Sequence, residues 1–312
     1  MQALINVILP VFLLLGFGYV AAWRKLISEQ TVDGIMLFAQ NFAVPTLLFT
    51  AIARLDLGQS FDIPLLITFY TGSFAAFLLG FFGARLLFNR SAQDAVAIGF
   101  VGMFSNTLLL GLPITERAYG VDALQWNFII IALHSPVMYT FGISVMEITR
   151  SRGQGVSPVA LGGRIGKSLA TNPLLIGILT GLVVNLSGVT LPAPVWSAVE
   201  MMNRAAIPTA LFGLGGVLLR YRPEGDAKVI AWVVFASLIL HPSISYGLGR
   251  FVFDLDIGPL RSAVLTASMA PGVNVYLFAS TYGTAKRVAA STVLIGTGLS
   301  VVTIWLWLLI LP

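Results

Sequence analysis

The sequence predicts an all-α integral membrane protein of ten transmembrane helices, arranged as two inverted repeats of five with two broken, crossing helices. Three observations predict this fold. The composition is strongly apolar, ten apolar runs are each long enough to cross a bilayer, and a proline-containing segment occurs twice. The two copies are "AVPTLLF" at residues 43–49 and "AIPTALF" at residues 206–212.

Composition alone places the chain in a membrane. Of its 312 residues, 57% are hydrophobic and only 10% are charged, and the mean hydropathy is +0.90. Soluble domains carry about 25% charged residues, so this chain has too little polar surface to face water. The net charge of +5 does not indicate a nucleic-acid partner, because the basic residues lie between apolar runs. The absence of cysteine excludes disulfides and thiolate metal sites.

The expected spans are the apolar runs of about 20 residues that a bilayer requires. They lie at approximately 3–22, 31–53, 63–87, 94–118, 123–147, 167–186, 196–219, 228–250, 261–283 and 288–311. The longest connection is glycine-rich and basic, which is typical of a linker. We therefore expect a first repeat at 1–149, a cytoplasmic linker at 150–166 and a second repeat at 167–312.

Basic residues predict the orientation. Lysine and arginine gather in alternate connections, for example Arg24 and Lys25 after the first span and Lys286 and Arg287 after the ninth. Cytoplasmic loops carry this excess. We expect a multi-pass protein of the cell's inner (plasma) membrane with both termini extracytoplasmic.

The duplication extends beyond the proline segment. An offset of 163 residues also pairs Pro10 with Pro173 and Gly18 with Gly181, and an offset of 168 pairs Asn106 with Asn274. Five spans in each half turn the second half upside down relative to the first. This is the sequence mark of secondary transporters that alternate access around a central site.

Two spans are interrupted at mid-depth. The interrupting residues are Ser105, Asn106, Gly111 and Pro113 in the fourth span, and Pro271, Gly272 and Asn274 in the ninth. Irregular backbone within a membrane has to line a protein cavity or find partners. Interrupted helices expose positive N-terminal ends, and asparagine amides donate hydrogen bonds, so the pattern predicts an anion site. The alternative is a pair of kinked packing helices whose asparagines bond to neighbouring backbone.

The seventh span carries two formal charges. Glu200 and Arg204 lie four residues apart on one helical face, and Asn41 is the counterpart of Arg204 in the first repeat. Arg204 and Asn41 are candidates for contact with a substrate carboxylate. Alternatively, Arg204 pairs with Glu200 or extends to the membrane surface. Pro45 and Pro208 are expected to shape their helices.

Proton coupling has three candidates, Glu200, His134 and His241, although a lone intramembrane histidine also serves as a hydrogen-bonded packing residue. No HExxH, GxxxxGK[ST] or nucleophile-elbow pattern occurs. We expect no enzyme, no ATP-driven pump, no cofactor and no metal.

The order of several motifs resembles the auxin efflux carrier family, which includes bacterial malonate and malate permeases. These motifs are "NFAVPTLLF", "SNTLLLGLP", "TNPLLIGILTGL", "AAIPTALFGLGGVL" and "PGVNVYLFASTYG". The resemblance implies a fold like that of sodium/bile-acid symporters. In that fold spans 1, 2, 6 and 7 form a scaffold that dimerises, and spans 3–5 and 8–10 form a transport unit.

The resemblance also implies a substrate class. In the family, asparagines near the crossing meet the substrate carboxylate, and Asn106 and Asn274 occupy those motif positions. Arg204 would suit a second carboxylate, so we expect a dicarboxylate such as malonate or malate, moved with H⁺ or Na⁺ coupling by an elevator-like or rocking motion. The alternatives are an exporter of auxin-like monocarboxylates and a non-transporting membrane sensor.

Overall fold

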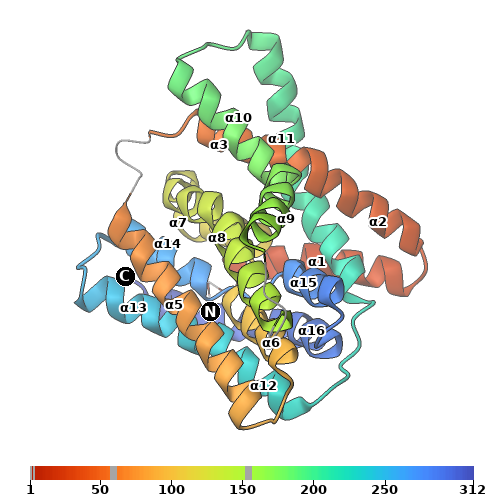
Figure 1. Cartoon of the computed structure of the whole chain (residues 1–312). Helices are drawn as coiled ribbons and strands as arrows, with labels where there is room; N and C mark the ends of the chain where they lie inside the picture. Colours follow the sequence, from red (N-terminus) through yellow and green to blue (C-terminus); the bar gives the residue numbers. More distant parts are fainter. Residues whose placement is uncertain (1, 3, 57–61, 152–156) are drawn as a thin grey trace. The chain divides into compact units, whose positions relative to one another are not determined.

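The computed structural model describes residues 2, 4–56, 62–151 and 157–312, and these residues form helices and no strands (Figure 1). The chain divides into two compact units. Unit 1 comprises Met1–Ile8, Asp62–Ile165 and Tyr221–Pro312, and unit 2 comprises Leu9–Phe61 and Gly166–Arg220. Each unit is built from segments of both halves of the chain.

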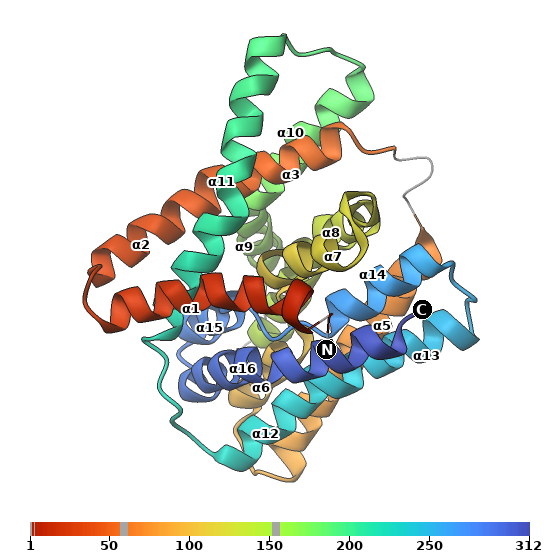
Figure 2. The same cartoon turned by 180° about the vertical axis from the view of Figure 1, so that it is seen from behind.

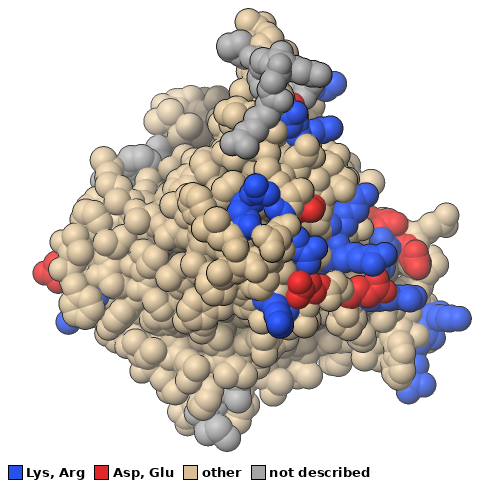
Figure 3. All heavy atoms as spheres, turned by 60° about the horizontal axis from the view of Figure 1, so that its bottom comes forward, with Lys and Arg blue, Asp and Glu red and all other residues tan. Residues whose placement is uncertain are grey.

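Six helical stretches of the described residues are long and apolar enough to cross a membrane. They are Ile5–Trp23, Glu29–Ala53, Ile63–Leu86, Val121–Arg150, Ala227–Phe251 and Lys286–Ile310. Ala92–Met103 and Pro173–Ser187 are shorter apolar helices. Large apolar side chains such as Phe17, Leu86 and Leu186 are exposed, as expected for a surface that faces lipid. Wide uncharged areas also dominate the face in Figure 3, where acidic and basic groups gather together. The arrangement of ten spans in two inverted halves stays a prediction.

Unit 2 contains two helix pairs held at short distance by glycine. Its helices are α1 (Leu9–Trp23), α2 (Glu29–Phe38), α3 (Val44–Ala53), α10 (Pro173–Ser187) and α11 (Ala193–Leu218). A Cβ atom on Gly18 of α1 would collide with the carbonyl oxygen of Phe212 in α11, and one on Gly181 of α10 would lie 2.5 Å from that of Phe49 in α3. Both contacts join residues of opposite sequence repeats, and both glycines and both phenylalanines are related by the same offset.

Unit 1 holds the remaining helices. They are α5 (Ile63–Leu86), α6 (Ala92–Met103), α7 (Leu112–Tyr119), α8 (Leu124–Arg150), α12 (Ala227–Phe235), α13 (His241–Phe251), α14 (Ile257–Ala267), α15 (Val273–Tyr282) and α16 (Lys286–Ile310). Helices α5 and α13 run alongside each other, as Figure 2 shows from behind. Leu65, Phe69 and Ile130 form a fully buried cluster with Ala263 and Ala267, which joins α5, α8 and α14.

Helix α9 (Pro158–Ala170) begins within the expected linker and continues into the expected sixth span. Part of the segment expected to be a linker is therefore helical. Residues 152–156 of that segment lie outside the described residues.

Four prolines each follow a π-helical turn. Pro10, Pro45, Pro113 and Pro242 are the second residues of α1, α3, α7 and α13, and five-residue π-turns precede these helices. Proline lacks an N–H group, and its ring collides with the carbonyl four residues earlier. The wider π-turn accommodates that ring without ending the helical path. Pro208, by contrast, lies inside α11, which continues through it without interruption.

Candidate functional site

The fourth and ninth expected spans are both broken, and their breaks bond to each other inside unit 1. Helix α6 ends at Met103 and α14 ends at Ala267. Between these ends and the next helices, Ser105 and Pro271 face each other as an isolated antiparallel β-bridge. The chain therefore forms a short two-stranded contact where helical hydrogen bonding stops.

Two backbone hydrogen bonds join residues 104–106 to residues 270–272, and this contact is called the crossing below. The Asn106 N–H donates to the Ala270 carbonyl at 2.8 Å, and the Gly272 N–H donates to the Phe104 carbonyl at 3.3 Å. Pro271 is compatible with this bridge because the two donors are the N–H groups of Asn106 and Gly272, and proline has no N–H group to contribute. Each break thus satisfies backbone groups of the other, which offsets the cost of leaving helical structure at this depth.

Only one of the two polar atoms of the Asn106 side-chain amide forms a hydrogen bond among the described residues. Its Oδ1 accepts a hydrogen bond from the Leu109 N–H at 3.1 Å and so caps the turn that follows the break. Its side chain is nearly buried, with 8% exposed. Among the described residues its Nδ2 has no hydrogen-bond partner. The group left over is a donor, which is the type that a carboxylate requires.

Gly272 and Asn274 lie across the crossing from Asn106. A Cβ atom on Gly272 would lie 3.6 Å from the Cα, Cβ and Cγ atoms of Asn106, so the two residues are in contact. Asn274 is half-buried in the first turn of α15, and its side chain has no hydrogen bond to any described residue. Helix α15 begins at Val273 without a side-chain cap. Its first N–H groups therefore lack helical partners close to Asn274.

Ser105 and the two histidines occupy the interior beside the crossing. Ser105 is fully buried, and its hydroxyl has no hydrogen-bond partner in the part of the chain that the structure describes. The ring centroid of His134 lies 4.5 Å from that of Phe104 and 5.6 Å from that of Phe69. His241 packs on Phe69 with centroids 5.0 Å apart, and its Nε2 lies 3.2 Å from the Phe69 carbonyl oxygen. Both histidines are thus buried and packed against aromatic rings.

Gly111 and Pro113 shape the helix that leaves the crossing. Gly111 ends the π-turn, and a Cβ atom there would lie 3.6 Å from the Asn106 carbonyl oxygen. Pro113 is buried in the first turn of α7. Among the described residues, no group of three or more histidine, aspartate or glutamate side chains is placed to hold a metal ion.

A buried hydrogen-bond network around Asn127, called the Asn127 node below, was not among the predicted site residues. Asn127 of α8 donates from Nδ2 to the hydroxyls of Thr115 at 3.2 Å and Thr266 at 2.8 Å, and its Oδ1 accepts from Ser262 at 2.8 Å. The node joins α7, α8 and α14, which flank both breaks. Its sequence signal was a single asparagine in the apolar run "LQWNFIII".

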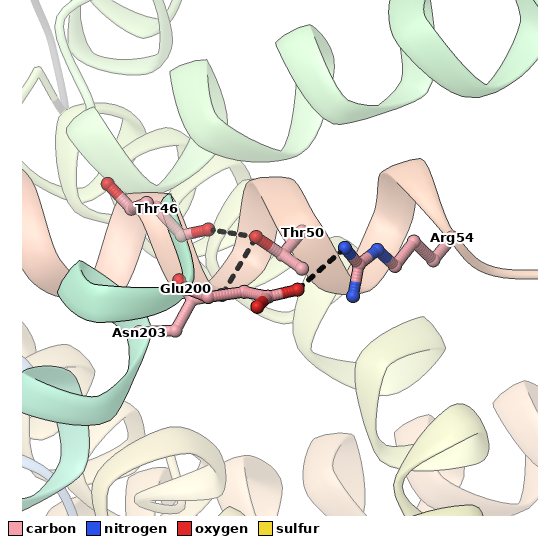
Figure 4. A network of polar contacts seen from close by, with 5 residues as sticks. All are labelled: Thr46, Thr50, Arg54, Glu200 and Asn203. Carbon is pink, nitrogen blue, oxygen red and sulfur yellow. Dashed lines mark hydrogen bonds and ion pairs between the residues drawn. The ribbon is translucent and has the colours of Figure 1, made fainter. Parts of the chain in front are cut away.

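The alternative in which Glu200 pairs with Arg204 does not occur among the described residues. In unit 2, Glu200 of α11 forms its ion pair with Arg54, which ends α3, at 2.9 Å (Figure 4). The guanidinium of Arg54 also lies over the ring of Trp196 in α11, with its Cζ atom 4.2 Å from the ring centroid. This contact holds the guanidinium within reach of Glu200 in the same helix. The side chains of Arg54 and Glu200 are 50% and 46% exposed.

The same network continues along the two helices. Asn203 donates to the Thr50 hydroxyl at 2.9 Å, and Thr50 donates to the Thr46 carbonyl at 3.0 Å (Figure 4). Arg204 is exposed and has no ion pair within the described residues. Asn41 is exposed in the π-turn before α3, and Pro45 is buried at the start of α3.

The predicted site residues thus fall into two groups. Ser105, Asn106, Gly272 and Asn274 come together in unit 1, with His134 and His241 nearby. Asn41, Pro45, Glu200, Arg204 and Pro208 belong to unit 2.

Comparison with known proteins gives matches along nearly the whole chain. A family model described as "Membrane transport protein" matches residues 3–308. A "Putative malonate transporter" of Rhizobium meliloti is 26% identical over 97% of this chain and 94% of that protein. "Uncharacterized transporter YfdV" of Escherichia coli is 24% identical, over 96% and 95%. "Auxin efflux carrier component 8" of Arabidopsis thaliana is 21% identical, over 94% and 93%.

Proposed function

Because the chain belongs to the membrane transport protein family, which is that of the auxin efflux carriers, we propose that it is a secondary transporter of small organic anions. The family match and the six apolar helices identify the chain as a multi-pass membrane protein of a transporter family.

The observation that carries the proposal is the bonded crossing of the two breaks in unit 1. At that point Asn106 offers an uncommitted amide donor beside the uncapped start of α15. Donors and a helix N-terminus together favour a carboxylate. One carboxylate would accept hydrogen bonds from Asn106 and Asn274 and from the first N–H groups of α15.

The division into two units supports alternating access. We propose that unit 1 is the transport unit, because it contains the whole crossing, and that unit 2 is the scaffold and the site of dimerisation. The Gly18–Phe212 and Gly181–Phe49 contacts support an inverted repeat, because they join the same two positions of the repeat in exchanged roles. In this mechanism unit 1 moves with its bound anion while unit 2 stays fixed in the membrane.

A dicarboxylate such as malonate is the proposed substrate. The Rhizobium relative described as a "Putative malonate transporter" supports it. Arg204, which is exposed in unit 2 and has no ion pair among the described residues, stays a candidate for contact with a second carboxylate. The plant relative favours auxin-like monocarboxylates as the alternative. A sensing role has one supporting relative, the "Lysosomal cholesterol signaling protein" of mouse, which is 21% identical over 95% of this chain but only 36% of that protein.

The deciding experiment is uptake into proteoliposomes that contain the purified protein. Radiolabelled malonate, malate and indole-3-acetate are supplied separately, with proton and sodium gradients imposed one at a time. We expect saturable malonate uptake and counterflow that follow one of the two gradients. Binding without uptake would leave the sensor, and flux without saturation or counterflow would indicate a channel.

A further inference from the structure

Unit 1 contains a cavity that none of the site residues line. Its volume is about 390 Å³, and it lies where α6, α12 and α16 begin. The charged residues of its lining are Arg90, Asp94, Asp226, Lys286 and Arg287. Three separate segments of the chain therefore contribute charge to one pocket that is open to its surroundings.

The acidic groups of the lining are already committed to the protein. Asp94 accepts from the Ala285 N–H at 2.9 Å. Asp226 accepts from the Lys228 N–H at 3.0 Å and from Arg90 Nη2 at 3.2 Å. One oxygen of Asp94 and both oxygens of Asp226 are thus engaged by donors of the protein.

The basic groups keep donors to spare. Arg90 has a buried Nε with no hydrogen-bond partner, although its Nη2 is paired. Lys286 is exposed and has no ion pair among the described residues. Arg287 approaches Glu224 only at 3.8 Å, with 79% of its side chain exposed. Such exposed pairs contribute little free energy, so Arg287 can reorient toward a ligand at small cost.

The backbone adds donors of the same kind. Helix α16 is 25 residues long and begins at Lys286, and its N-cap position is taken by Ala285, which offers no side-chain acceptor. Ala285 also has a φ of 46°, an unfavourable conformation for alanine that turns the chain into the helix at this point. Asp94 already accepts from the Ala285 N–H, and the next N–H groups, those of Lys286 and Arg287, have no side-chain cap.

We propose that this cavity is a second anion site, specific for a phosphate group and separate from the carboxylate site at the crossing. A phosphate presents several acceptor oxygens at once, which suits two guanidinium groups, one ammonium group and a helix N-terminus. The pocket is larger than inorganic phosphate, so it leaves room for a phosphate group carried on a larger body. That body is either a soluble phosphorylated metabolite or an anionic phospholipid.

Bound phosphate would join the starts of α6 and α16 to the segment that contains Gly225 and Asp226. Helix α6 ends at the crossing, so occupancy of the cavity would stabilise unit 1. This role lies beyond the proposed transport of carboxylates.

Binding is measured on the purified full-length protein, without transport. Inorganic phosphate is titrated in detergent against chloride of equal ionic strength, and the melting temperature is followed. We expect a saturable rise for the wild type. Lys286→Gln and the double variant Arg90→Gln/Lys286→Gln should weaken apparent phosphate affinity, the single change by about tenfold. Lys228→Gln is the matched control, because it removes an exposed neighbouring cation that does not line the cavity.

A second measurement separates the two sources of phosphate. Native mass spectrometry compares retention of phosphatidylglycerol with that of phosphatidylcholine in the wild type and in Lys286→Gln. Selective retention that Lys286→Gln abolishes identifies a lipid ligand, and saturable phosphate binding without it identifies a soluble one.

The proposal is overturned if the wild type shows neither effect, or if Lys286→Gln and Lys228→Gln behave alike. Malonate that competes with phosphate at equal concentration also overturns it, because the cavity would then be an entry site for the substrate. Failure of malonate uptake in proteoliposomes leaves these binding results unchanged, so the two proposals are tested independently.

Discussion

Replacing Asn106 by alanine removes two separate interactions, and a matched variant can divide them. The first is the cap of the turn after the break, where Oδ1 accepts from the Leu109 N–H at 3.1 Å. Losing such a cap costs about 0.5–2 kcal/mol of stability. The second is the proposed donation from Nδ2 to a substrate carboxylate, and a hydrogen bond to a charged group contributes about 1.5–3 kcal/mol. That energy corresponds to about 10- to 150-fold in affinity.

Asn106→Ser separates the two effects, because serine caps helices about as well as asparagine but lacks the amide donor. The crossing itself survives in both variants, since its hydrogen bonds use only backbone atoms of residue 106. We expect both variants to lose malonate affinity by about 10- to 150-fold, while only Asn106→Ala also melts a few degrees lower.

The assays are calorimetric titration of malonate, saturation of uptake in proteoliposomes, and thermal unfolding. Uptake of Asn106→Ser at the wild-type affinity would refute the reasoning, because the amide would then have no part in binding. Equal melting temperatures for the alanine and serine variants would refute only the capping argument.

Four further outcomes follow from the same geometry. Asn274→Ala should abolish uptake without lowering stability, because its side chain has no described hydrogen bond, and normal uptake would remove it from the site. Gly18→Ala should destabilise the protein by about 1–3 kcal/mol through collision with the Phe212 carbonyl, whereas Gly16→Ala, which meets open space, should be harmless. Thermal unfolding of both variants checks this, and equal melting temperatures would contradict it. Arg204→Ala should weaken uptake of a dicarboxylate more than that of a monocarboxylate, and equal losses would exclude contact with a second carboxylate. His134→Gln should keep malonate exchange at zero gradient but lose acceleration by an imposed proton gradient, and an unchanged response would show that this histidine takes no part in coupling.

Local chemistry made the helix breaks predictable from sequence. Proline and glycine at 271 and 272, and serine and asparagine at 105 and 106, cannot continue an apolar helix without cost, and the helices do end beside them. The family was likewise predicted from motif order and is confirmed by the match over residues 3–308. The roles of these residues in binding stay predictions.

Contacts between distant segments were not predictable in the same way. Glu200 lies four residues from Arg204, and that spacing favoured a pair within one helix. Its actual partner is Arg54, 146 residues away, held in place by stacking on Trp196. The spacing of residues within one helix does not indicate which other helices pack against it. The Asn127 node was missed for the same reason, because its three hydroxyl partners come from two other helices.

The Ser105–Pro271 bridge has a consequence for how substrate preference can change. Its two hydrogen bonds belong entirely to the main chain, so the frame of the crossing does not depend on which side chains surround it. Replacements at neighbouring positions can therefore alter the size and polarity of the side chains around the crossing while the backbone that carries them stays intact. One architecture could in this way accommodate acids as different as a three-carbon diacid and an indole derivative.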